Sequence, residues 1–110
     1  MPSYLIQISF KPETLAAMMK APADRRQVVT KLAEQVGGKL VGYWFTFGDY
    51  DAVLIVEGPD NVSAATMAIA VSSTGAFTNF KTTPMLTMEE ALSALEKATK
   101  IDYTPPMGKR

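Results

Sequence analysis

Residues 40–57 read LVGYWFTFGDYDAVLIVE, a pattern that predicts two adjacent β-strands. Leu40–Phe47 is rich in aromatic side chains, and Tyr50–Glu57 contains a continuous run of apolar residues. Gly48-Asp49 between them suits a two-residue type II′ turn, because glycine favours the first central position of that turn. The unbroken run Val53–Val56 predicts a strand that is covered on both faces.

A second two-sided strand is predicted near the N-terminus, over Ser3–Phe10. Alternation with a period of two places the aromatic and β-branched residues at positions 4, 6, 8 and 10 on one face. Leu5 lies on the opposite face, so both faces of this strand carry apolar side chains. We therefore expect it at the centre of a sheet.

Two helical segments are predicted between these strands. The first runs over Glu13–Lys20, and Pro22 fits the first turn of the next, where its missing N–H would have no helical partner. Gly37 suits the end of the second helix. Spacings of three and four give that helix an apolar stripe, made of Val28, Val29, Leu32, Ala33 and Val36.

A third helix and a fourth strand follow the aromatic hairpin. Asp60 or Asn61 can cap a helix that runs to about residue 74, and its small side chains allow it to lie close to a sheet. The fourth strand is predicted over Ala76–Met85, with Phe77 and Phe80 on opposite faces.

The C-terminal region predicts one more helix and an extended tail. Thr87 and Glu90 have the spacing of a capping box, which starts a helix that runs to about Lys100. Residues 101–110 form the tail, and Tyr103–Pro106 within it is expected to be extended. The side chains that this helix is expected to bury are those of Met88, Ala91, Leu92 and Leu95.

The order β-α-β-β-α-β plus a final helix predicts an α+β fold of the ferredoxin-like type, in one domain over residues 1–110. Two helices would cover one face of a four-stranded antiparallel sheet and leave the other face bare. The apolar side chains on that bare face exceed what a monomer usually exposes. We expect the sheets of two chains to pair face to face in a homodimer or higher homo-oligomer. The alternative is that the last helix folds over the bare face.

The hairpin segment Gly48-Asp49-Tyr50-Asp51 resembles the Gly-x-Tyr-Asp signature of the GYD domain family. That resemblance implies a dimeric α+β barrel, in which two ferredoxin-like sheets close on each other. It implies no particular activity. The other segments that resemble the family are Gly37-Gly38-Lys39-Leu40, Gly75, Thr82–Thr87 and Tyr103–Pro106.

Composition excludes several kinds of chemistry. The 110 residues include no cysteine and no histidine, which excludes disulfides, zinc–thiolate sites and histidine general bases. Eleven basic and eleven acidic residues are interleaved along the chain, so we expect no nucleic-acid partner. No apolar run approaches a membrane span, and the N-terminal residues differ from a signal peptide, so we expect a cytoplasmic protein without a membrane partner. We also expect no metal and no cofactor.

Four residues are candidates for binding a ligand: Tyr50, Asp51, Trp44 and Lys81. Tyr50 and Asp51 could donate and accept protons if burial changed their pKa values, although Asp51 could equally accept hydrogen bonds from the turn. Trp44 could line a pocket or pack in an interface, on the face opposite Tyr43. Lys81 could contact an anion, or it could simply lie in solvent on an edge strand.

Further residues leave the same choice between binding and packing. Arg25 and Arg26 are possible anion contacts. The other possible pocket walls are Tyr43, Phe45, Met18, Met19, Met85 and Met88. Two functions follow from these observations. The protein either binds a small ligand or assembles without catalysis, or it is a cofactor-independent enzyme, such as an isomerase or monooxygenase, that acts on a small organic molecule. Whether it is an enzyme, and which residues would be catalytic, stay open at this point.

Overall fold

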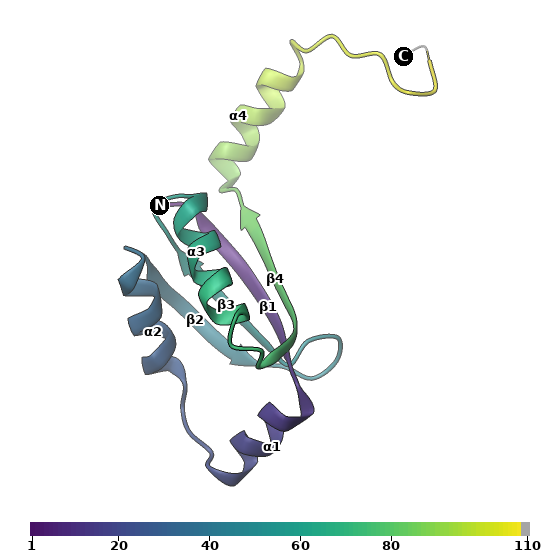
Figure 1. The fold of residues 1–110 in the computed structure, drawn as a ribbon. Coiled ribbons are helices and arrows are strands. Elements are labelled where there is room, and N and C mark those ends of the chain that lie inside the picture. Colours follow the sequence, from purple (N-terminus) through teal and green to yellow (C-terminus); the bar gives the residue numbers. More distant parts are fainter. Residues whose placement is uncertain (109–110) are drawn as a thin grey trace.

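The computed structural model describes residues 1–108, which form a four-stranded antiparallel sheet with the strand order β2-β3-β1-β4 (Figure 1). This is the ferredoxin-like order that the sequence predicts. The elements within these residues are β1 (Ser3–Phe10), α1 (Pro12–Lys20), α2 (Arg26–Gln35), β2 (Lys39–Phe45), β3 (Ala52–Glu57), α3 (Asn61–Ser72), β4 (Phe77–Met85) and α4 (Met88–Ala98).

The core lies on one face of the sheet, beneath α2 and α3 (Figure 1). β1 is a central strand, paired with β3 on one side and β4 on the other. Its even-numbered residues are buried, as predicted, and they pack with the buried residues of β3 and with Met67 of α3. Each large apolar side chain buried in this way contributes about 1.5–3 kcal/mol to folding.

Within residues 1–108, no helix covers the opposite face of the sheet, and we call it the open face. Its central side chains are half-buried in the single chain rather than fully exposed, because neighbouring side chains on the sheet shield one another. Strand register places these residues on it: Leu5, Gln7 and Ser9 of β1, Val53 and Ile55 of β3, Trp44 of β2, and Lys81 and Thr83 of β4.

The predicted two-residue turn at Gly48-Asp49 is wrong. β2 ends at Phe45 and β3 begins at Ala52, so residues 46–51 form a longer loop. Thr46 holds this loop closed: its N–H donates to the Asp51 carbonyl at 2.8 Å and its hydroxyl donates to the Tyr50 carbonyl at 2.7 Å. Threonine side chains compete with ladder hydrogen bonds in this way, which ends the strand pairing early.

Asp51 extends the pairing of β1 with β3 through its backbone N–H and its side-chain carboxylate. Its N–H donates to the Ile8 carbonyl at 2.8 Å, and its Oδ2 accepts the Phe10 N–H at 2.9 Å. The carboxylate thus stands where the next carbonyl of β3 would lie. Asp51 has the structural role of a backbone acceptor, although its partner belongs to β1 and not to the turn.

The prediction that Phe77 and Phe80 lie on opposite faces is also wrong. Phe77 pairs with Phe10, and Phe80 pairs with Ile8, so both face the helices. Their ring centroids are 5.9 Å apart in an edge-to-face arrangement. The register of the β1–β4 pairing shifts between Ser9 and Phe10 of β1. Such a bulge changes which face of the sheet a residue occupies.

The predicted helix caps are confirmed. The Oδ1 of Asp60 accepts the Ser63 N–H at 2.8 Å at the start of α3. Thr87 and Glu90 form the capping box of α4, with distances of 3.1 Å from the Glu90 N–H to the Thr87 hydroxyl and 2.9 Å from the Thr87 N–H to Glu90 Oε1. The side chains of both caps are thus fixed by local hydrogen bonding.

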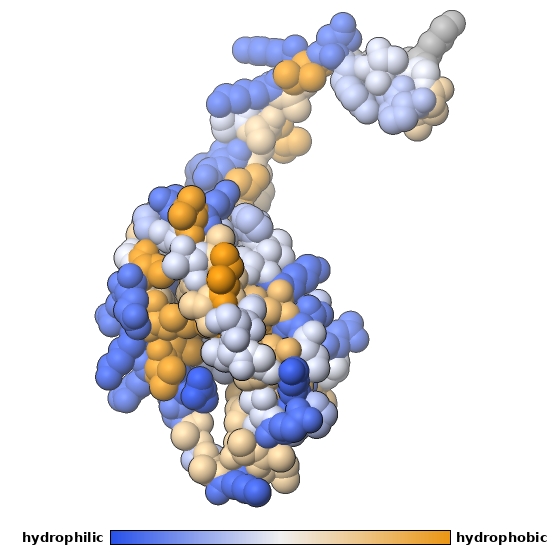
Figure 2. Space-filling view, in the orientation of Figure 1, coloured by the Kyte–Doolittle hydropathy of each residue, from blue (hydrophilic) through white to orange (hydrophobic). Residues whose placement is uncertain are grey.

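The C-terminal helix does not pack on the sheet. α4 projects beyond the end of β4, and Figure 2 shows apolar side chains on its surface. None of its residues is buried, so the prediction that Met88, Ala91, Leu92 and Leu95 are buried in their own chain is wrong. The alternative in which the last helix covers the open face is contradicted for the same reason. A helical stripe shows that a covering surface is required, not where that surface lies.

We call residues 86–108 the C-terminal arm. It gives the chain an extended shape, with a radius of gyration of 17.9 Å, compared with about 13 Å for a compact chain of this length. The predicted extended tail lies within the arm, except for residues 109 and 110, which are outside the described residues.

We predict that Asp51→Ala lowers the free energy of unfolding by about 1–3 kcal/mol, because the Phe10 N–H loses its acceptor. Urea denaturation measures this change. Asp51→Asn keeps an oxygen acceptor and should lose less. Asp49→Ala is the matched control, since only the backbone carbonyl of Asp49 is used, by the Ser9 hydroxyl. An Asp51→Ala protein as stable as the unaltered chain would contradict this role.

Candidate ligand-binding cavity

An apolar cavity of about 1010 Å³ lies on the helix side of the sheet. Phe10, Phe45 and Phe77 line it from the strands, and α1, α2 and the end of α3 contribute the other sides. The ring of Phe10 lies 5.9 Å from that of Phe45 and 5.5 Å from that of Phe77, centroid to centroid. The volume lies at the upper end of the range for small-molecule sites.

The cavity exists because α1 lies at the end of the sheet and not over its centre (Figure 1). None of the residues of α1 is fully buried; Met18 is half-buried against the core, and the Met19 side chain is 79% exposed. The prediction that Pro22 begins the second helix is wrong: α2 begins at Arg26, and Pro22 lies in the connecting loop. That loop separates α1 from α2 and forms part of the cavity wall.

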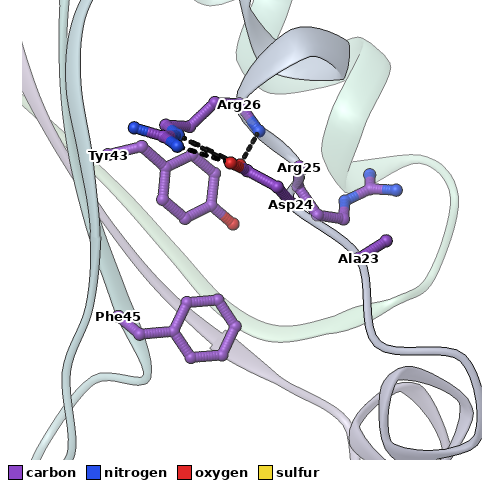
Figure 3. A pocket seen from close by; sticks show the side chains of 6 residues that line it. All are labelled: Ala23, Asp24, Arg25, Arg26, Tyr43 and Phe45. Carbon is purple, nitrogen blue, oxygen red and sulfur yellow. Dashed lines mark hydrogen bonds and ion pairs between the residues drawn. The ribbon is translucent and has the colours of Figure 1, made fainter.

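A smaller cavity of about 180 Å³ adjoins the first, and Figure 3 shows its six lining residues. Ala23, Arg25 and Phe45 line both cavities, so the two lie side by side at these residues. The larger part is apolar. The smaller part carries the polar groups of Asp24, Arg26 and Tyr43.

Asp24 forms its ion pair with Arg26 and not with Arg25. The Nη2 and Nε atoms of Arg26 lie 2.6 Å and 2.9 Å from Asp24 Oδ2, and the Arg26 N–H lies 3.0 Å from Oδ1. The side-chain and then the backbone hydrogen bonds of Arg26 hold the pKa of Asp24 at about 2. Figure 3 shows the guanidinium of Arg25 pointing away from this pair. Among residues 1–108, no hydrogen bond or ion pair of Arg25's side chain is present.

Tyr43 adds a phenol to the smaller cavity, which Arg25 also lines. Burial raises the pKa of Tyr43 above its ordinary value of 10, and the charge of Arg25 acts in the opposite direction. The hydroxyl is therefore protonated at neutral pH and can donate a hydrogen bond. Arg25 and Tyr43 both line the smaller cavity.

The four candidate residues from the sequence do not meet in one place. Trp44 and Lys81 lie on the open face, in one row across the sheet through Val53 and Gln7. Three strand spacings separate them, which is about 14 Å. Tyr50 and Asp51 lie in the loop at the end of the hairpin. None of the four lines either of the two cavities described above, so their role in binding stays a prediction.

Trp44 packs along its own strand. A Cβ atom placed on Gly42 would lie 2.3 Å from Cη2 of the Trp44 indole, so only glycine allows the ring to lie this close. The indole is nevertheless 51% exposed. It forms part of the apolar surface of the open face.

Sequence reasoning identified part of the cavity and missed the rest. Phe45 lies opposite Trp44 by strand alternation, and it lines the cavity with Arg25, Met18 and Met19. The walls formed by Phe10 and Phe77 were missed. The signal that could have revealed the cavity is the proline-containing loop after α1, which prevents α1 and α2 from forming one continuous helix over the sheet.

Two features are absent from the part of the chain that the structure describes: a group of metal-ligating side chains and a helix able to cross a membrane. Within residues 1–108, no three His, Cys, Asp or Glu side chains gather so as to hold a metal ion. No helix in that range combines the length and the apolar character needed to cross a bilayer.

The fold and the cavity together define an α+β, ferredoxin-like protein with a small-molecule-sized space between sheet and helices. The family model of the GYD domain matches residues 4–95, so the chain belongs to the GYD domain family, as the hairpin signature indicated.

Two solved structures share the fold at low sequence identity. MtbAldR is 12% identical with a TM-score of 0.52, and the match covers 78% of this chain and 53% of that one. The chain thus spans about half the length of MtbAldR. The 5-chloro-2-hydroxyhydroquinone dehydrochlorinase of Burkholderia phenoliruptrix AC1100, solved with 2,5-dihydroxybenzoquinone, is 14% identical with a TM-score of 0.52. That match covers 76% of this chain and 93% of the dehydrochlorinase. Among proteins with curated descriptions, none matches the chain.

We predict that the Asp24 carboxyl titrates at about 2 in the folded protein, as followed by its carboxyl carbon signal in NMR. Arg26→Gln should return this pKa toward the ordinary 3.8. Because the folded pKa lies below the unfolded one, the pair stabilises the fold above pH 3.8, and that contribution is lost as the pH falls toward 2. Titration near 3.8 in the unaltered protein would show that the pair does not form in solution.

Proposed function

We propose that the protein is a homodimer that binds a small organic ligand in the cavity between its sheet and its helices. The single observation that carries the ligand-binding part is the apolar cavity of about 1010 Å³, with a few polar groups at one end. Such a combination is typical of small-molecule sites. The dehydrochlorinase that shares the fold was solved with a small ring compound, which supports this proposal by analogy of fold alone.

Binding fits the cavity better than catalysis does. A cofactor-independent enzyme needs a positioned group that moves a proton. Among the described residues, no carboxylate lines the larger cavity, and Asp24 of the smaller one is held by Arg26 with a lowered pKa. The Asp51 carboxylate accepts a backbone hydrogen bond elsewhere. The isomerase or monooxygenase alternative is therefore the weaker one.

The open face supports the homodimer. Leu5 pairs with Ile55, and Val53 pairs with Trp44, so apolar side chains from three strands adjoin on a face without a covering element. In a two-fold dimer the same patch lies on both partners and buries itself. This arrangement leaves the ligand cavity accessible, because the cavity lies on the opposite face of the sheet.

The C-terminal arm supports the same assembly. Met88, Leu92 and Leu95 lie on one side of α4 by their spacing, and each is more than half exposed. The arm leaves the sheet at the end of β4, whose Thr83 and Lys81 lie on the open face. We propose that the arm of each copy packs on the other copy, where it covers apolar surface that its own chain leaves exposed.

We predict that 2-naphthamide, a neutral ring compound, shifts amide NMR signals of residues that line the cavity, such as Phe45, Val28 and Leu32. Val28→Trp should abolish these shifts, because Val28 lines the cavity and a larger side chain would fill it. The matched control is Val62→Trp, an exposed position on α3 outside the cavity. If no concentration of the probe moves these signals, the cavity does not bind ligands of this kind.

We predict that native mass spectrometry finds twice the mass of one chain. Ile55→Lys should shift the protein to monomer, because two buried charges would face each other across the paired sheets. Ala65→Lys, on an exposed position of α3, is the control with the same charge change.

The arm is tested separately in the same measurement. Replacing both Leu92 and Leu95 by Glu should weaken the dimer, whereas Ser93→Glu on the same helix should not. A monomer at all concentrations for the unaltered chain would contradict the proposed assembly and leave the ligand proposal standing.

A further inference from the structure

The cavity carries one unneutralised charge. Arg25 is the single charged residue among those that line the larger cavity, and it also lines the smaller one. Its neighbour Arg26 is matched by Asp24 through four hydrogen bonds, so that pair has no net charge. Arg25 therefore gives the lining of the cavity a net positive charge.

Other polar groups in the cavity are mostly engaged. The Thr14 hydroxyl donates to the Ala76 carbonyl at 2.8 Å, and the Thr74 hydroxyl donates to the Val71 carbonyl at 2.8 Å. Tyr43 is different, since its half-buried phenol lines the smaller cavity together with Arg25 and has no hydrogen bond to another described residue. A guanidinium and a phenol donor at one end of an apolar space can together bind an anionic oxygen group.

The walls determine what the rest of the ligand is like. Phe10, Phe45 and Phe77 present neighbouring aromatic rings, and Met18 and Leu32 add flexible apolar side chains. Flat aromatic bodies pack well against such rings. Methionine adapts to the shape of whatever lies against it.

We infer that the ligand class is an aromatic carboxylate, with its ring among the phenylalanines and its carboxylate bound by Arg25 and the Tyr43 hydroxyl. This inference rests on the proposed ligand binding and specifies its chemistry. Arg25 is exposed to solvent, so its contribution is screened by salt. The carboxylate is thus expected to add both affinity and salt dependence.

The test compares 2-naphthoate with 2-naphthamide, which has the same ring without the charge, by titration calorimetry at low and high salt. At low salt 2-naphthoate should bind about tenfold more tightly, the usual scale for a charge-assisted hydrogen bond. High salt should reduce this difference. Arg25→Gln should abolish the difference, because it should weaken 2-naphthoate far more than 2-naphthamide. Lys31→Gln, an equal charge change on α2 outside the cavity, should have no effect on either probe.

Three outcomes would overturn the inference. Equal binding of both probes, with no effect of Arg25→Gln, would show a cavity that does not select anions. Equal weakening of both probes by Arg25→Gln would assign Arg25 a structural role. Binding of neither probe would also remove the ligand proposal itself, whereas the first two outcomes would leave that proposal intact. Tyr43→Phe provides a second check, since it should weaken 2-naphthoate more than 2-naphthamide.

Discussion

Burial of the sheet on one face and not on the other is the constraint on which the rest of the structure depends. β1 and β3 carry apolar side chains on both faces, and the chain has helices to cover one. On the covered face, Tyr4, Ile8 and Leu54 are almost completely buried. On the open face, Leu5, Val53 and Ile55 are only shielded by one another. Burial of that second face requires another surface, and the chain's own C-terminal helix does not supply it.

The two properties that we propose, ligand binding and assembly, lie on opposite faces of the sheet. The helix side holds a cavity at the end where α1 departs from the sheet, and Arg25 gives its lining a positive charge. The open face and the C-terminal arm carry the surfaces that we assign to assembly. Because the properties lie on opposite sides, a dimer formed through the open face leaves the ligand cavity free. The lack of histidine and cysteine is no obstacle to either, since neither requires those side chains.

The fold was largely predictable because its signals are local. Strand alternation in residues 3–10, the caps at Asp60 and Thr87, and the hairpin signature each depend on residues close in sequence. The errors came from interactions between distant segments. The bulge between Ser9 and Phe10 that turns Phe77 inward depends on how β1 pairs with β4. The partner of the Asp51 carboxylate lies 41 positions away, in β1.

The candidate site was predictable only in part for the same reason. Alternation separates Phe45 from Trp44 but does not say which face each occupies; the pairing of Phe45 with the buried Ala52 places it on the helix side. The cavity that Phe45 lines depends on where α1 lies, and no spacing in the sequence determines that position. The stripe on α4 was recognised correctly as apolar, but its exposure depends on a covering surface that the stripe does not identify.

The most direct measurement of the central claim uses Trp44, the only tryptophan in the chain. It lies on the open face and its side chain is 51% exposed in a single chain. Its fluorescence quenching by acrylamide should be measured over a dilution series, with Ile55→Lys as the reference for an unpaired face. If open faces pair, quenching is weak at high concentration and rises to the reference value on dilution. Strong quenching at every concentration, equal to that of Ile55→Lys, would contradict the pairing of open faces.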